Sequence, residues 1–404
     1  MDTMKKTTLF ILFISFTFWC FPTYGKSRIA SVPFQVVGTY VVVEVTINGS
    51  SKLNLILDSG LSATLITELR AEDSLTLNYS SEYEIKGLGP GTGIMSYRSI
   101  NNTIKAGKIN IPNSQVFVLR ENIFNLSNHV GSKINGILGA DFFEGRVVKI
   151  NYNTHYITFY DAKTFEVPKG YSPIQMIIEG HKMFVSLPVA DVDWSVKNAI
   201  MLLDTGAEVS AWFRSFGNAP FQIPSKKMHG YIGQGLNGMI EGYMGRVNQI
   251  NMGGNILRNP IVSFPDSISI AEAISASERD GTIGAQLLNR FNLIFDQSRK
   301  MLYVKPNVNF KKPFSYNIAG IELIIENKLF ALPEVCNVRK DSPAELAGVQ
   351  VGDMIFQINE LSGLKTNINE MKKIFELSNR KFLYLTVLRG SKTIDFKIEM
   401  KGVL

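Results

Sequence analysis

Two short turns of the same residue types could each hold a carboxylate that takes part in chemistry. Asp58-Ser59-Gly60 follows the apolar run Leu55-Ile56-Leu57, and Asp204-Thr205-Gly206 follows Met201-Leu202-Leu203. A single Asp in such a turn usually just bonds its own backbone. Two copies brought together would form a carboxyl pair in which one pKa is raised and one proton is shared. Such a pair could activate a water molecule and polarise a carbonyl group, as general acid–base hydrolysis requires.

The two turns belong to a longer internal repeat. Gly87-Leu88-Gly89 returns as Gly233-Gln234-Gly235, 146 residues later, and the same offset relates Asp58 to Asp204. Asn135-Gly136-Ile137-Leu138-Gly139 returns as Asp280-Gly281-Thr282-Ile283-Gly284. Because duplicated sequence indicates duplicated structure, we expect two lobes related by a pseudo-twofold axis that passes near both aspartates.

The pattern inside each copy predicts a mainly β fold. Runs rich in β-branched residues, such as 40–47, 114–119 and 156–160, are separated by Gly, Asn and Pro turns. One short helix is expected in each copy, at 140–144 and at 285–291. We therefore predict a first lobe over residues 26–165 and a second over residues 166–308.

The neighbours of the aspartates have predictable roles in such a pair of lobes. Ser59 and Thr205 can each donate a hydroxyl hydrogen bond to the turn of the other lobe. Gly60 and Gly206 leave room for backbone amides to approach the carboxylates. We predict that these four residues support the catalytic turns.

These motifs resemble those of aspartic peptidases of the retropepsin and pepsin clan. The resemblance implies a two-lobed β-barrel architecture, duplicated about a pseudo-twofold axis, with Asp58 and Asp204 as catalytic residues. It also implies that the glycine-rich segments, Gly87-Leu88-Gly89 and Gly233-Gln234-Gly235, are flaps that close over an extended peptide. Leu61 and Ala207 depart from the pepsin pattern, which often has a hydroxyl three positions after the aspartate.

Other hydrolytic chemistries lack the residues they need. The four histidines form no His-Glu-x-x-His pair and there is no cysteine cluster, so we expect no metal and no cofactor. A serine mechanism would leave the repeated aspartate unexplained. The alternative to an endopeptidase is a catalytically idle scaffold of the same fold that binds peptides.

A different pattern fills the last hundred residues, 309–404. A capped helix at 341–348, a strand at 351–359, an amphipathic helix at 367–377 and a hairpin at 382–399 follow one another. Their order, with the Ser342-Pro343-Ala344 start, resembles PDZ domains of exported bacterial proteases. The resemblance implies that a peptide's C-terminus adds to the strand after Ala319-Gly320-Ile321. The alternative is a structural cap that binds no peptide.

The first 25 residues have the features of a signal peptide. Lys5 and Lys6 precede an apolar run from Leu9 to Phe21, which is shorter than a spanning helix, and small residues follow it. We therefore expect an exported protein, periplasmic, cell-surface or secreted, without a transmembrane helix after the leader is removed; an uncleaved N-terminal anchor is the alternative. The formal charge of +7 is spread along the chain, so protein or peptide substrates are expected as partners and nucleic acid is not.

Overall fold

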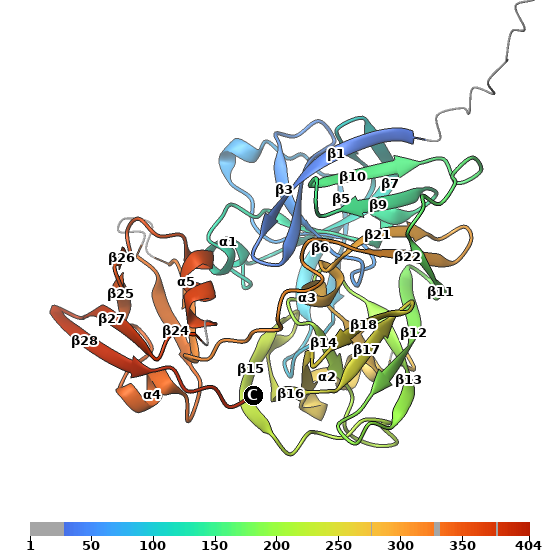
Figure 1. The fold of residues 1–404 in the computed structure, drawn as a ribbon. Helices are drawn as coiled ribbons and strands as arrows, with labels where there is room; N and C mark the ends of the chain where they lie inside the picture. Colours follow the sequence, from blue (N-terminus) through green and yellow to red (C-terminus); the bar gives the residue numbers. More distant parts are fainter. Residues whose placement is uncertain (1–27, 276, 327–331, 377–378) are drawn as a thin grey trace, which may run out of the picture.

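The computed structural model describes residues 28–404, except 276, 327–331 and 377–378 (Figure 1). The predicted signal peptide, residues 1–25, lies outside the described residues. The described part is mainly β, as the sequence predicts, and forms two lobes and a smaller C-terminal unit. In this part, no helix is long and apolar enough to cross a membrane.

The first lobe is built from ten strands with three short helical segments. They are β1 (Arg28–Val37), β2 (Tyr40–Ile47), β3 (Leu53–Leu57), β4 (Thr64–Ile66), η1 (Ala71–Asp73), β5 (Tyr79–Ile85), β6 (Ile94–Ala106), β7 (Ile109–Leu119), α1 (Leu126–Val130), β8 (Gly136–Leu138), η2 (Ala140–Phe143), β9 (Val147–Asn151) and β10 (Tyr156–Tyr160). The segment predicted as a helix over 140–144 is a 3₁₀ turn.

The second lobe repeats much of this order. Its elements are β11 (Ser172–Glu179), β12 (Lys182–Ala190), β13 (Val196–Leu203), β14 (Ala211–Phe213), β15 (Lys227–Gly235), β16 (Gly238–Arg246), β17 (Gln249–Met252), β18 (Asn255–Arg258), β19 (Ile261–Pro265), α2 (Ser267–Ser275), β20 (Gly281–Ile283), α3 (Ala285–Leu288), β21 (Phe291–Asp296) and β22 (Met301–Pro306). The helix predicted over 285–291 ends early because Phe291 begins a buried strand.

One antiparallel sheet joins the two lobes. Its strands lie in the order β1-β10-β9-β21-β22-β11, and the lobes meet where β9 pairs with β21. The pairing sets Val148 opposite Phe295, and the Phe143 and Phe295 rings lie 4.8 Å apart beneath it. Both rings are fully buried in a core that spans both lobes, so removing either would cost about 3–5 kcal/mol. This shared core holds the turns of Asp58 and Asp204 in a fixed relation.

The C-terminal unit has a separate core and a sheet in the order β23-β24-β25-β27-β28. Its elements are β23 (Ile321–Ile324), β24 (Glu334–Val338), α4 (Pro343–Ala347), β25 (Met354–Ile358), β26 (Leu361–Ser362), α5 (Ile368–Phe375), β27 (Phe382–Arg389) and β28 (Lys392–Glu399). Ser342 caps α4 and Gly348 ends it in the left-handed conformation, with φ of 93°. Helix α5 faces α1 of the first lobe (Figure 1).

Candidate active site

Each catalytic turn follows a buried strand that is supported from below. Strand β3 runs parallel to β8, and the Asp58 amide donates to the Leu138 carbonyl at 2.9 Å. Strand β13 runs parallel to β20, and the Asp204 amide donates to the Ile283 carbonyl at 3.0 Å. The two halves of the repeat thus place their aspartates in equivalent positions.

Four hydrogen bonds lock the two turns together. The Ser59 hydroxyl donates to the Leu203 carbonyl at 2.8 Å, and the Thr205 hydroxyl donates to the Leu57 carbonyl at 2.7 Å. Each hydroxyl also accepts a hydrogen bond from the other's amide, at 3.1 Å in both cases. Ser59 and Thr205 are buried, so water cannot replace these bonds. The predicted cross-lobe donors therefore lie where they fix the spacing of the aspartates.

Gly60 and Gly206 allow the carboxyl groups to approach. A Cβ at Gly60 would stand 2.7 Å from the Asp204 carboxyl, and one at Gly206 would meet the Asp58 carboxyl. The amides of Gly60 and Leu61 donate to Asp58 Oδ1 at 2.7 and 3.1 Å, and the Gly206 amide donates to Asp204 Oδ1 at 2.9 Å. Each glycine thus leaves space for the carboxyl of the opposite lobe and donates its amide to the carboxyl of its own lobe.

The two carboxyls differ in their affinity for a proton. Burial raises the pKa of Asp58 well above its usual range, and the charge of Asp204 raises it further. Burial also raises the pKa of Asp204, but the hydrogen bond from Asp58 and the positive charge of Arg279 oppose this rise. Both carboxyls therefore bind a proton more readily than an exposed aspartate does, and the pair can share one proton.

The two predicted flaps meet tip to tip above this pair. The Asn237 amide donates to the Leu88 carbonyl, and the Gly91 amide donates to the Asn237 carbonyl, both at 2.7 Å. The Asn237 side chain also accepts from the Gly87 amide at 3.3 Å, and Gly89 donates to the Ser269 carbonyl at 2.8 Å. Asn237 lies between β15 and β16, two residues beyond the glycine pattern that marked the flap.

A cleft of about 1180 Å³ lies under the flaps and contains both aspartates. Gly87, Leu88, Gly233, Gln234 and Gly235 line it. The C-terminal unit forms part of its wall and contributes Glu322, Cys336, Asn337, Asn369 and Lys372. Sequence reasoning missed this wall, because no local pattern indicates where one domain docks against another.

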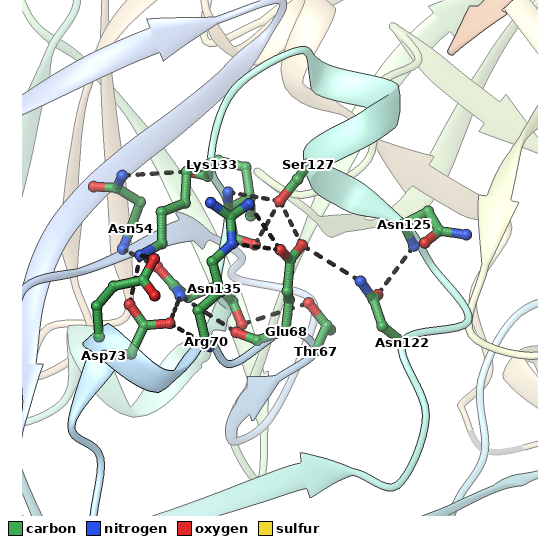
Figure 2. Close-up of polar contacts among 12 residues, drawn as sticks. Asn54, Thr67, Glu68, Arg70, Asp73, Asn122, Asn125, Ser127, Lys133 and Asn135 are labelled. Carbon is green, nitrogen blue, oxygen red and sulfur yellow. Dashed lines mark hydrogen bonds and ion pairs between the residues drawn. The ribbon is translucent and has the colours of Figure 1, made fainter. Parts of the chain in front are cut away.

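A buried polar cluster in the first lobe supports the strand beneath Asp58 (Figure 2). Asp73 accepts hydrogen bonds from Lys133 at 2.5 Å and from Asn135 at 2.9 Å. Asn135 in turn accepts from the Asn54 amide at 3.0 Å, and so ties the start of β8 to β3. The Ser127 hydroxyl, on α1, donates to Glu68 at 2.6 Å in the same cluster. The catalytic turn and helix α1 therefore share one support.

In the predicted peptide-binding loop of the C-terminal unit, backbone amides already donate hydrogen bonds within that unit. The Ile318 and Ala319 amides donate to the Phe375 carbonyl, and the Gly320 amide donates to the Asn317 side chain at 2.8 Å. Ala319 and Ile321 are fully buried. Beyond β23, the Ile325 amide donates to the Asn128 carbonyl of the first lobe at 3.1 Å.

Helix α5 contacts the same segment of the first lobe. Asn369 donates to the Val130 carbonyl at 2.9 Å, and Lys372 donates to the His129 carbonyl at 3.0 Å. The segment that carries α1 thus lies against α5 and against β23, the strand to which a peptide was predicted to add.

Two lobes that each supply one carboxyl to a shared, flap-covered cleft define the class of aspartic proteinases. Residues 43–142 match the aspartyl protease family, and residues 334–389 match the PDZ domain family. The chain therefore contains an aspartyl protease domain and a C-terminal PDZ domain.

Two further similarities concern individual proteins. The chain is 31% identical over 90 residues, 22% of its length, to a probable CtpA-like serine protease in two strains of Staphylococcus epidermidis; the match spans 18% of the length of those relatives. The crystal structure of the aspartic proteinase from Irpex lacteus is similar over 70% of this chain and 98% of that one, with 13% identity and a TM-score of 0.41.

Proposed function

We propose that this protein is an aspartic endopeptidase that hydrolyses peptide bonds in extended segments of other proteins. The observation that carries the proposal is the carboxyl pair, in which Asp58 and Asp204 are hydrogen-bonded to each other and hold unequal pKa values. A water molecule between them would be the nucleophile. The flaps above the pair would exclude bulk water and hold the substrate backbone.

We assign the role of base to Asp204 and the role of acid to Asp58, because the positive charge of Arg279 favours the ionised form of Asp204. Ionised Asp204 takes a proton from the water as its oxygen bonds to the scissile carbonyl carbon, while Asp58 gives its proton to the carbonyl oxygen. The C–N bond then breaks as Asp204 returns a proton to the leaving amine and Asp58 recovers one from the tetrahedral intermediate. No covalent intermediate with the enzyme forms.

The PDZ domain would present substrates to this cleft. Because it lines part of the cleft, a peptide that it holds would have a short path to the aspartates. Such a peptide would displace the first-lobe segment that carries α1 from β23 and α5. The features of the first 25 residues support export of the protein, to the periplasm, the cell surface or the medium.

The test is cleavage of a peptide library by the purified protein, with and without an active-site inhibitor of aspartic proteinases. Asp58→Asn and Asp204→Asn should each abolish cleavage while the protein stays folded, and the double variant should be no worse than either. Cleavage that survives in either single variant would refute the shared pair. Inhibitor binding without any cleavage would favour the idle scaffold.

A further inference from the structure

Arg279 is a buried cation in the wall of the catalytic cleft. It lies two residues before β20, the strand that supports Asp204, and it is 5% exposed. It lines the cleft together with Asp204, Lys182 and Trp212. Its guanidinium carbon lies 5.1 Å from the centre of the Trp212 ring.

The guanidinium group has unused hydrogen-bonding capacity. Among the described residues, neither Nε nor Nη1 of Arg279 has a hydrogen-bond partner, although both atoms are buried. A guanidinium offers five N–H donors in a planar fork that suits a carboxylate. The Trp212 ring stabilises the positive charge but accepts no strong hydrogen bond. A buried charge without partners is costly, so a ligand that supplies an acceptor here would bind favourably.

The surrounding charges favour an anionic ligand. Lys182, at the start of β12, is half-buried in the same wall, and burial, together with the charge of Arg279, lowers the pKa of its ammonium group. Burial lowers the pKa of Arg279 to about 10, so the guanidinium is charged at neutral pH. Asp204 interacts with both cations, and Glu179 also interacts with Lys182.

Comparison with the other lobe indicates that the repeat does not need this arginine. The offset that relates Asp280 to Asn135 places Ile134 at the equivalent position, where the side chain is 1% exposed and packs with Val42 and Ile56. An apolar residue therefore suffices to support the catalytic turn. The role of Arg279 in the second lobe therefore lies in the cleft and not in the support of the turn.

We propose that Arg279, assisted by Lys182, forms a subsite that binds a carboxylate of the substrate, so that the enzyme selects peptides with an Asp or Glu side chain near the scissile bond. The inference rests on the proposed peptidase function. A free C-terminal carboxylate has the same chemistry, and the test separates the two sources.

The test uses matched peptides that differ only in Glu or Gln at one position on either side of the cleaved bond, each made with a free or an amidated C-terminus. Hydrogen bonds to charged groups imply a preference for Glu of about tenfold to a hundredfold in kcat/KM. Arg279→Met should reduce the preference to about twofold or less, and Arg279→Lys should keep part of it. Arg258→Met, at an exposed arginine of β18 outside the cleft, should leave it unchanged.

The outcomes are distinct. Equal rates on Glu and Gln peptides in the unaltered protein, with no effect of the free terminus, would overturn the inference while leaving the peptidase intact. Preference for the free terminus alone would support the subsite and assign its carboxylate to the chain end.

A binding arm needs no turnover, and so separates failure of the subsite from failure of the peptidase. Fluorescent Glu and Gln peptides are titrated onto the Asp58→Asn protein, with and without Arg279→Met. Tighter binding of Glu peptides that is lost with Arg279 supports the subsite even if nothing is cleaved. Equal affinities overturn it.

Discussion

Replacing Thr205 by valine should weaken the whole two-lobed unit, although valine has nearly the same shape. The change removes two buried hydrogen bonds, one donated to the Leu57 carbonyl at 2.7 Å and one accepted from the Ser59 amide at 3.1 Å. Thr205 is 1% exposed, so both partners would be left without water. At about 1–3 kcal/mol for each unsatisfied group, we expect the free energy of unfolding to fall by about 2–6 kcal/mol. Because the turns also set the spacing of the aspartates, kcat should fall roughly tenfold to a hundredfold.

The assay is urea unfolding followed by tryptophan fluorescence. Among the described residues, tryptophan occurs at 194 and 212, both in lobe two, and Trp212 is 3% exposed; the signal therefore reports on the peptidase unit. Thr205→Ser keeps the hydroxyl and should retain most of the stability. Ser62→Ala removes a hydroxyl from an exposed position in the first turn and should change little. A Thr205→Val protein as stable as Ser62→Ala would refute the assignment of the cross-lobe bonds.

Three further predictions follow from single contacts. Burial and the charge of Glu144 raise the pKa of Asp141 to about 6, above its unfolded value of about 4. The folded state therefore favours the protonated side chain, and this stabilisation is lost as pH rises from about 4 through about 6. Asp141→Asn should therefore stabilise the protein by about 2 kcal/mol at pH 8 and not at pH 4, and an equal effect in urea unfolding at both pH values would contradict this. Asn237→Ala should speed hydrogen exchange of the Gly87 amide without altering the protection of core strands, because the side chain accepts from that amide; unchanged exchange would count against the flap contact. The double variant Asn369→Ala with Lys372→Met should loosen the contact between the PDZ domain and the first lobe, and proteolysis between residues 307 and 317 should become faster. The control Lys373→Met, on the exposed side of α5, should not change the rate of proteolysis. Equal rates in the two proteins would refute this docking.

The features that the repeat duplicates could be predicted from the sequence, whereas few of the contacts between the two copies could. The mainly β fold and the PDZ domain are confirmed, and the structure brings Asp58 and Asp204 together as the repeat implies. The helix predicted over 285–291 is wrong beyond Leu288, because an apolar run such as Phe291–Asp296 has no period that separates a buried strand from a helix. Its identity as a strand depends on pairing with β9, a contact between lobes.

The contacts that the sequence could not indicate are those between distant surfaces. Asn237 was missed because its role arises only where two hairpin tips meet. Lys372 lies on a helix whose amphipathic pattern shows which face is buried in the PDZ core, but not which other domain touches the helix. A signal for Arg279 was present, since a charged residue there breaks the apolar pattern set by Ile134 in the other copy.

That departure from symmetry is what distinguishes the two aspartates. The strands, glycines and cross-lobe hydroxyls are duplicated, so they give both carboxyls similar surroundings and cannot decide which one holds the proton. Backbone amides donate to each aspartate, and neither Leu61 nor Ala207 adds a hydroxyl. Besides the hydrogen bonds from Asp58 and the Gly206 amide, the charge of Arg279, which has no counterpart in the first lobe, lowers the pKa of Asp204. The residue proposed to select the substrate would thus also favour negative charge on the aspartate that takes a proton from the attacking water.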